Sequence, residues 1–161
     1  MTTVYYQTAA TIRQFWIDAG LGLEDFHADG IIANADAESS LNWLAVGDGG
    51  KAYGLHQLHS DRTVGIYEGF KDHASGKIIW PGSWIDVAKL PSLNAQLCAV
   101  KWELLHSEHH ALAMLKTATD ATEAGSLFCQ YYERPGAPGQ AEKRGARAAW
   151  WNAYFAKNPV A

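Results

Sequence analysis

A glycine-rich, polar segment at residues 47–57 interrupts a chain that is otherwise patterned for helices. Apolar residues recur at helical spacing in six segments, which are 5–19, 24–38, 93–106, 108–117, 121–134 and 140–156. The Asp-Gly and Gly-Gly pairs at 48–50 favour turns with positive φ, so we expect a small hairpin whose strand covers 52–58. The pattern predicts a mostly α (α+β) fold, a helical bundle with a small β-hairpin. Gly30 weakens the prediction of the 24–38 helix, because glycine is a poor helix former.

Polar residues stand where two of these helices would begin. Ser92 is placed to cap the helix over 93–106. Asp120 and Glu123 have the spacing of a capping box, in which the side chain of each residue accepts a hydrogen bond from the backbone N–H of the other. These residues set the expected starts of two helices.

The stretch between the hairpin and the 93–106 helix is harder to assign. A helix over 62–70 is expected, followed by an irregular loop over 71–91 that contains Gly76, Pro81, Gly82 and Pro91. Trp80 and Trp84 fall in this loop, and the sequence leaves open whether they line a groove or fill the core.

Length and charge limit the classes of protein to be considered. A chain of 161 residues suits a single domain over 1–161, and no linker or internal repeat divides it. The net charge of -4 argues against a nucleic-acid partner. Four basic residues gather late in the chain, and they either meet an anionic polymer or form a solvated helix face; they are Arg134, Lys143, Arg144 and Arg147.

The two cysteines, Cys98 and Cys129, both lie in apolar helical patterns. Cysteine is among the residues most often buried, so two buried free thiols are the expected state. A disulfide between the two helices remains an alternative.

Glu38 is the residue that most directly points to chemistry. It falls at the C-terminal end of the predicted 24–38 helix, where the helix dipole and apolar surroundings would both raise the pKa of a carboxyl group. A carboxyl group that stays protonated near neutral pH can donate a proton to a leaving oxygen. An exposed glutamate is the usual reading of such a position, but the glycine cluster that follows favours a ligand site. The segment therefore predicts acid-catalysed cleavage of a sugar polymer.

A second carboxylate is less clearly defined. Asp48 lies ten residues after Glu38 and is either a catalytic group that positions water or the aspartate that its glycine neighbours require in a turn. The carboxyl groups of inverting glycosidases lie about 6.5–9.5 Å apart, and those of retaining ones about 5–5.5 Å. Asp61 and Glu133 are weaker candidates, and Glu133 is expected to pair with Arg134.

The histidines raise a metal-dependent hydrolase as the rival class. His106 and His110 are four residues apart and could share a helix face, but the sequence contains no His-Glu-x-x-His motif and no cysteine pair with ligand spacing. We therefore expect no metal site and no cofactor. His59 is expected to bond the loop or a sugar hydroxyl.

Several segments together resemble the lysozyme superfamily, in the branch of phage-type lysozymes and the lytic transglycosylase-like domains of tail lysins. Glu38-Ser39 is followed by Gly54-Leu55-His56-Gln57, as in that branch. The similarity continues in four further places, which are Asn34, Gly47-Asp48-Gly49-Gly50, His59-x-Asp61-Arg62 and the segment from Phe128 to Pro135. Leu58 stands where these relatives often carry tryptophan.

The resemblance implies a lysozyme-like fold with the hairpin beside an active-site cleft. It implies that Glu38 is the general acid for the bond between N-acetylmuramic acid and N-acetylglucosamine, and that Tyr132 supplies a hydroxyl near this acid. The other residues that it places at the substrate are Ser39, Tyr53, Gly54, Leu55, Gln57 and His59.

The expected activity is that of a muramidase of the phage or prophage endolysin type. Lytic transglycosylation, which gives 1,6-anhydro products, and a non-catalytic glycan-binding module are the alternatives. The expected partner is the glycan strand of peptidoglycan, bound by a monomer that does not insert into membranes. No signal peptide is apparent, so we expect synthesis in the host cytoplasm and delivery to the cell wall by a holin-type membrane protein or a virion.

Overall fold

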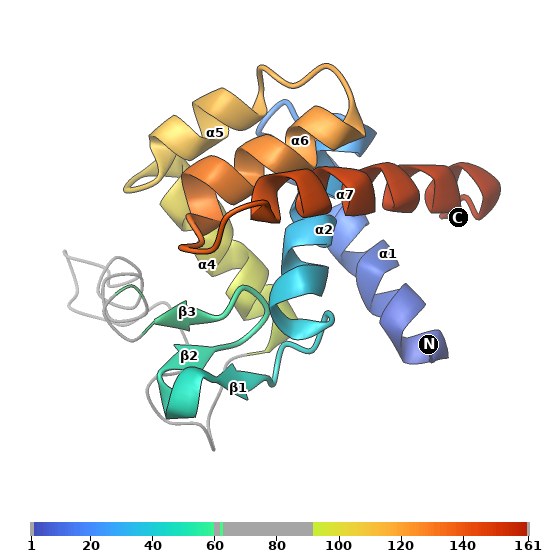
Figure 1. The fold of residues 1–161 in the computed structure, drawn as a ribbon. Coiled ribbons are helices and arrows are strands. Elements are labelled where there is room, and N and C mark those ends of the chain that lie inside the picture. The colour runs from blue at the N-terminus through green and yellow to red at the C-terminus, as the bar shows by residue number, and fades with distance from the viewer. Residues whose placement is uncertain (1, 60–61, 63–91, 161) are drawn as a thin grey trace, which may run out of the picture.

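The computed structural model describes residues 2–59, 62 and 92–160 (Figure 1). The predicted 62–70 helix and 71–91 loop, with Trp80 and Trp84, lie outside the described residues, apart from Arg62. The described helices are α1 (Thr3–Asp18), α2 (Asp25–Ser39), the short 3₁₀-helix η1 (Asp48–Gly50), α4 (Leu93–Leu105), α5 (His109–Leu115), α6 (Ala121–Phe128), the π-helix η3 (Cys129–Glu133) and α7 (Gln140–Lys157). The strands are β1 (Val46–Gly47), β2 (Ala52–Tyr53) and β3 (Leu58–His59). None of these helices is long and apolar enough to cross a lipid bilayer.

The mostly α (α+β), lysozyme-like prediction is confirmed, with the helices in one group and a small sheet at their edge (Figure 1). α2 packs against α1, α6 and α7 and lies among them, and its C-terminal end is directed toward the sheet. Its buried apolar residues, Ile31 and Ile32 among them, belong to the same core as Trp16 of α1 and Trp151 of α7. The bundle therefore fixes the helix that carries Glu38.

The sheet is antiparallel with the order β1-β2-β3, and Val46 pairs with Tyr53, which in turn pairs with Leu58. The prediction of one strand over 52–58 is wrong, because a turn divides it into β2 and β3. Gly54 (φ 76°) and Gln57 (φ 50°) adopt left-handed backbone conformations that a continuous strand does not allow. The turn brings residues 54–57 back toward α2.

Both predicted helix caps exist, one of them with altered partners. The Ser92 side chain accepts a hydrogen bond from the N–H of Ala95 at 3.2 Å, as predicted for the start of α4. Asp120 caps α6 by accepting from the N–H of Glu123 at 2.8 Å. The reciprocal half of the box is wrong, because the Glu123 carboxylate accepts from the backbone and hydroxyl of Thr119 instead.

The helix predicted over 121–134 changes type near its end. The α-helix stops at Phe128 and continues as the π-helix η3, in which the N–H of Arg134 donates to the carbonyl of Cys129, five residues back, at 2.8 Å. Arg134 then adopts φ 51° and ends the helix before Pro135. Such wide turns rotate the following side chains relative to an α-helix and are frequent at functional sites.

Two glycines allow α2, α6 and α7 to approach closely. A Cβ atom on Gly30 would lie 2.6 Å from the carbonyl carbon of Ala124, and one on Gly125 would lie 2.5 Å from the carbonyl oxygen of Arg144. Asn34 joins the same contact by donating from Nδ2 to the carbonyl of Gly125 at 3.0 Å. Gly30 costs helix propensity, but the close helix contact requires it.

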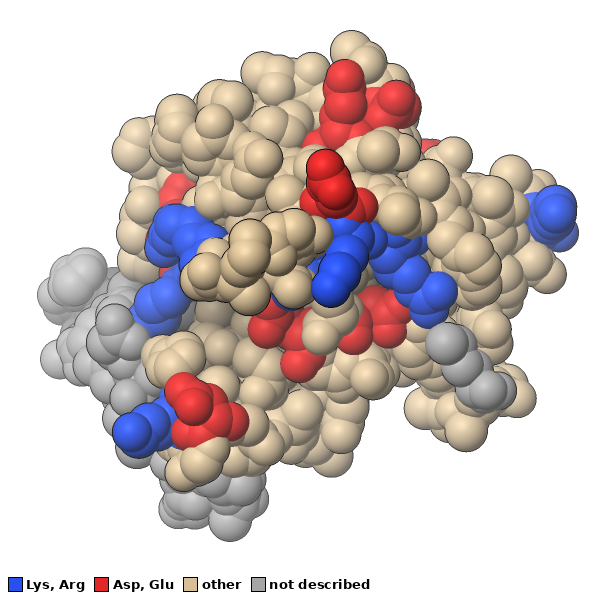
Figure 2. All heavy atoms as spheres, viewed as in Figure 1, with Lys and Arg blue, Asp and Glu red and all other residues tan. Residues whose placement is uncertain are grey.

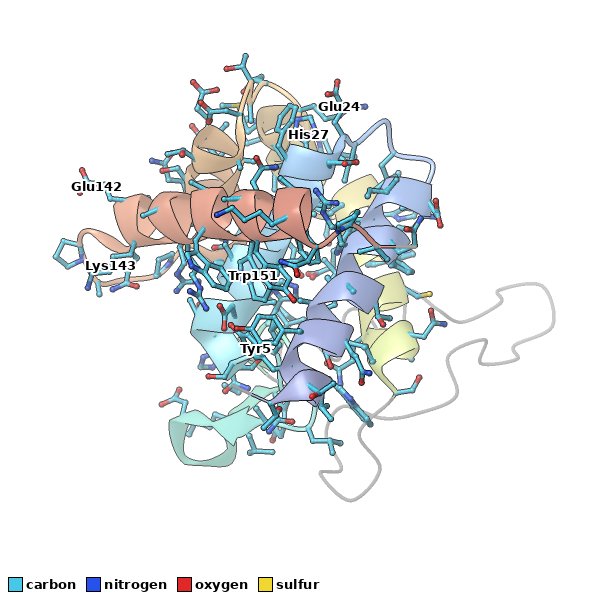
Figure 3. All side chains as sticks on the ribbon, turned by 90° about the vertical axis from the view of Figure 1, so that its right-hand side faces the viewer. Tyr5, Glu24, His27, Glu142, Lys143 and Trp151 are labelled. Atoms are coloured by element: carbon cyan, nitrogen blue, oxygen red, sulfur yellow. The ribbon has the colours of Figure 1, made fainter. Side chains whose placement is uncertain are left out.

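The last turn of α2 is also fixed from its other side. Asp36 Oδ2 accepts hydrogen bonds from the Tyr5 hydroxyl at 2.7 Å, from Arg147 Nε at 2.7 Å and from Trp151 Nε1 at 3.2 Å. Figure 3 shows Tyr5 and Trp151 side by side between α1 and α7, and their ring centroids are 5.4 Å apart. Burial and Asp36 raise the pKa of the Tyr5 hydroxyl far above its ordinary value, so it remains a donor.

Both cysteines are free, as expected. Cys129 is buried, whereas Cys98 is only half-buried, so the expectation of two fully buried thiols holds for Cys129 alone.

Candidate functional site

A pocket of about 330 Å³ opens where the end of α2, the β2–β3 turn and the segment after η3 meet. Its lining residues are Glu38, His56, Gln57, Leu58, His59, Arg62, Glu133, Arg134, Pro135 and Gly136. Figure 2 shows acidic side chains in the middle of this face, with basic side chains on both sides. Larger pockets lie along α1. In the one of about 510 Å³, two charged lining residues, Asp25 and Arg13, form an ion pair with each other.

Glu38 lies at the C-terminal end of α2, as predicted, and its side chain is 23% exposed to the pocket side. Its Oε1 accepts a hydrogen bond from Arg144 Nη2 at 2.9 Å. Burial is the largest cause that raises the pKa of Glu38, and the charge of Glu133 raises this pKa further. Arg144 and His56 lower the pKa but do not cancel the upward shift. The raised pKa agrees with the sequence prediction, and it favours a protonated acid.

Arg144 is a buried part of this site, not a surface residue. Its Nη1 lies 3.3 Å from both the carbonyl and the side-chain oxygen of Asn34. Because Asn34 is itself bonded to Gly125, the guanidinium is held in one place by α2 and α6. Arg144 therefore fixes the orientation of the Glu38 carboxyl group.

The predicted basic cluster does not form a common surface. Arg134 pairs with Glu108 at 2.7 Å and Arg147 with Asp36 at 2.7 Å, while Arg144 is buried against Glu38. Lys143 lies with Glu142 at the outer end of α7 (Figure 3). The expectation that these residues form one anion-binding or solvated face is wrong, because three of the four charges are used in separate ion pairs.

The site contains a pair that the sequence did not indicate. His56 Nδ1 lies 2.5 Å from Glu133 Oε1, and the Glu133 side chain is 4% exposed. The predicted pairing of Glu133 with Arg134 is wrong, because Arg134 turns to Glu108 after the π-helix. No local pattern could connect residues 77 positions apart, although His56 stands inside the Gly-Leu-His-Gln segment.

Asp48 takes the position of a turn residue. It opens η1 with φ 50°, its side chain is 63% exposed, and its Oδ2 lies 3.6 Å from His59 Nε2. His59 lines the pocket with Glu38, but Asp48 is not among the lining residues. The structure therefore brings His59 to the site and leaves Asp48 outside its lining.

Four of the residues expected at the substrate are not among the residues that line the pocket, and they bond the backbone and side chains around it instead. The Ser39 hydroxyl donates to the carbonyl of Leu55 at 2.8 Å, and the Leu55 N–H donates to Gln96 Oε1 at 2.9 Å. The Tyr53 hydroxyl donates to the carbonyl of Gly50, and the Gly54 N–H to that of Ala45. The two bonds of Leu55 hold the β2–β3 turn to α2 and α4, and the other two bonds join residues of the sheet and its adjoining loops.

Gln57 is both a lining residue and a brace of the sheet. Its Nε2 donates to the carbonyls of Gly54 at 2.9 Å and Ala45 at 3.2 Å. A Cβ atom on Gly47 would overlap Gln57 Oε1, so a larger residue there would displace this amide. Gln57 thus lines the pocket with a side chain whose amide nitrogen is held by two hydrogen bonds to the backbone.

The Tyr132 hydroxyl bonds Glu103 and not Glu38, the acid beside which the resemblance placed it. Tyr132 is fully buried, and its hydroxyl donates to Glu103 Oε1 at 2.6 Å. Arg62 also binds Glu103 and places its guanidinium 4.6 Å from the centre of the Tyr132 ring. Burial and the Glu103 charge raise the pKa of the Tyr132 hydroxyl well above its ordinary value. Tyr132 therefore anchors η3 in the core through Glu103 and Arg62, contacts that the sequence did not reveal.

The possible metal-binding histidines fall on different elements. α4 ends at Leu105 and α5 begins at His109, so His106 and His110 do not share one helix. His106 stacks on Trp102 and bonds its carbonyl, while the ring of His110 lies against Tyr131. Among the described residues, no group of three or more histidine, cysteine, aspartate or glutamate side chains is placed to hold a metal ion.

Comparison with protein families identifies a match over most of the chain. The family model described as phage tail lysozyme matches residues 7–155, which is most of the chain. Among curated proteins and solved structures, no match to this chain was found.

Proposed function

Because the chain belongs to the phage tail lysozyme family, we propose that it is a muramidase with Glu38 as its general acid. Family membership indicates a lysozyme-like, glycosidase-type action on peptidoglycan. The specific reaction proposed is hydrolysis of the β-1,4 bond between N-acetylmuramic acid and N-acetylglucosamine. The observation that carries the proposal is a half-buried glutamic acid with a raised pKa in a pocket of polar side chains.

The contacts of Glu38 indicate which oxygen carries the proton. Oε1 accepts from Arg144 and must present a lone pair there, whereas no described residue bonds Oε2. The proton therefore sits on Oε2 and passes from it to the glycosidic oxygen as the bond from C1 breaks. Arg144 then stabilises the carboxylate that remains.

We propose that the sugar rings contact Gln57 and His59, which line the pocket beside Glu38. Ser39, Tyr53, Gly54 and Leu55 contribute by holding this wall in place. In this proposal Tyr132 acts beneath the site through Glu103 and does not touch the substrate.

The products of a peptidoglycan digest test the proposed reaction. We expect fragments that end in reducing N-acetylmuramic acid, identified by mass spectrometry after borohydride reduction, and equal release with and without a strong chelator. If 1,6-anhydro ends dominate the products, the protein is a lytic transglycosylase and not a hydrolase. Released peptides without new sugar ends, together with loss of activity in chelator, would indicate a metal-dependent amidase.

The rate is expected to fall as pH rises through the raised pKa of Glu38. A general acid must be protonated, and burial together with Glu133 keeps Glu38 protonated to higher pH, against the opposing effects of Arg144 and His56. The midpoint of the alkaline limb of kcat/KM should therefore lie above 4.5, the ordinary value for a glutamate. Release of reducing ends at constant ionic strength measures it, and a midpoint at or below that value would contradict the assignment.

We further propose that the protein acts as a monomer on the cell wall and is carried there by a virion. The family description as a tail lysozyme supports a virion component over an endolysin released through a holin-type protein. Detection of the chain in purified virions by mass spectrometry would separate the two routes.

A further inference from the structure

We propose that Glu133, held by His56, is the second catalytic carboxylate of this pocket and accepts the proton of the attacking water. The proposal rests on the muramidase function stated above and adds to it a residue and its role. It replaces Asp48, the sequence candidate, by a residue from the opposite end of the chain.

The first argument is the arrangement of the Glu133 carboxylate. Oε1 is bonded to His56 Nδ1, and both side chains are buried. Oε2 has no bond to a described residue, and it is not among the buried polar atoms that lack a partner. Since Glu133 lines the pocket, Oε2 is the oxygen that it presents there.

The second argument is the effect of Glu133 on Glu38. Glu38 and Glu133 line the same pocket, and the charge of Glu133 raises the pKa of Glu38. Glu38 is bonded by an arginine through one oxygen, and Glu133 by a histidine through one oxygen. Each group is thus left with a single free oxygen, as expected of one proton donor and one proton acceptor.

The π-helix explains how a buried segment delivers this carboxylate. Tyr132 and Glu133 are adjacent, yet Tyr132 turns into the core to Glu103 while Glu133 turns to His56 and the pocket. The Arg62 guanidinium, stacked on Tyr132 and bonded to Glu103, fixes the turn from below. The carboxylate is consequently placed by side chains that are themselves held by hydrogen bonds and packing, as catalysis requires.

Asp48 lacks these properties. Its side chain is largely exposed, its nearest ionic partner is the exposed His59, and it is outside the set of residues that line the pocket with Glu38. A carboxylate in water gains little from its surroundings as a base, whereas one in a partly enclosed site acts at lower effective dielectric.

The reaction balances with these two groups. Glu38 gives its proton to the glycosidic oxygen, and the bond between C1 and that oxygen breaks. Water adds to C1 and gives one proton to Glu133 Oε2. After the sugars leave, Glu133 releases its proton to solvent and Glu38 takes one up, so that one water is consumed for each bond. His56 acts as a positioning residue, because the bond between its Nδ1 and Oε1 holds the carboxyl group in place.

The decisive experiment compares Glu133→Gln with the matched variant Glu142→Gln. Both remove one carboxylate, but Glu142 is exposed near the start of α7 and bonds no described residue. We expect Glu133→Gln to lower kcat by a factor of about 10²–10⁴ with KM and the melting temperature close to wild type. Glu142→Gln should leave all three unchanged. A Glu133→Gln enzyme that keeps more than half of the wild-type kcat would overturn the proposal.

Chemical rescue provides a readout that a structural role would not give. Azide added to Glu133→Ala can attack C1 without a base, so turnover should recover and glycosyl azide should appear in the products. Azide should not restore Glu38→Ala in this way on natural glycan, because the leaving oxygen still needs a proton. No glycosyl azide from Glu133→Ala would count against the role of Glu133.

Two further variants separate the possible failures. If Glu133→Gln does not melt cooperatively, Glu133→Asp takes its place, because aspartate keeps the negative charge beside His56 but its shorter side chain moves the free oxygen away from the pocket. An unchanged kcat in Glu133→Asp would refute the role of Glu133 as the base. If Asp48→Asn loses activity while Glu133→Gln does not, Asp48 is the second carboxylate and the muramidase proposal stands. If the wild-type protein releases no reducing ends, the proposed function itself fails.

Discussion

Replacing Glu38 with glutamine is expected to lower kcat on peptidoglycan by a factor of about 10²–10⁴. Glutamine keeps an oxygen that can accept the Arg144 hydrogen bond seen at 2.9 Å, so the buried guanidinium retains its partner. What is lost is the proton on Oε2, which the glycosidic oxygen needs as it leaves. Loss of rate with little loss of stability is therefore the predicted signature of a general acid at this position.

Turbidity loss of purified cell walls measures the rate, and co-sedimentation with the same walls measures binding. Glu142→Gln again serves as the control, since it removes an exposed carboxylate two residues from Arg144. Undiminished lysis by Glu38→Gln would show that the assigned role is wrong. A wild-type protein that sediments with the walls but releases nothing would instead be a glycan-binding module of the same fold.

Replacing Asp29 with alanine is expected to lower the free energy of unfolding by about 3–5 kcal/mol. Asp29 is completely buried, and its two oxygens accept from Arg13 Nε at 2.7 Å, Arg13 Nη2 at 3.1 Å and Asn152 Nδ2 at 2.8 Å. These bonds join α2 to α1 and α7. Without the carboxylate, the buried Arg13 charge keeps only the exposed Asp25 at 3.5 Å as an ionic partner among the described residues, and most of the penalty of burying that charge remains.

Asp25 offers a matched control on the same arginine. It lies 3.5 Å from Arg13, but its side chain is 64% exposed, so Asp25→Ala should cost at most about 1 kcal/mol. Urea denaturation followed by far-UV circular dichroism gives both values. Equal losses in the two variants would show that the buried pair contributes no more than a surface pair does.

The helical part of the fold was predictable because it depends on local pattern. Apolar spacing located α1, α2, α4, α5 and α7 closely, and Ser92 and Asp120 marked two starts. The strand over 52–58 was mispredicted because two residues with positive φ divide it, and Gln57 is not a residue that usually signals a turn. The π-helix also left no local sign, since tertiary contacts of Tyr132 and Glu133 select it over an α-helix.

The candidate site was predictable in part for the same reason. The position of Glu38 at a helix end beside the pocket was predictable because its signal is local, a glutamate at the end of an apolar pattern followed by a glycine turn. Glu103, Arg144 and the pairing of His56 with Glu133 were not, because each depends on a partner from a distant segment. The partner of the Tyr132 hydroxyl was also not predictable, since a buried hydroxyl must find a partner inside the protein and Glu103 comes from a distant segment.

The sequence by itself determined the helices, the glycine turn and the position of Glu38 at the end of α2, because spacing and backbone preference act between neighbours in the chain. Only the tertiary structure decided which charges meet. It buried Arg144 against Glu38, left Asp48 in solvent and brought Glu133 to the pocket on a π-helix. Ion pairs depend on distance in space and on local dielectric, and the order of residues specifies neither.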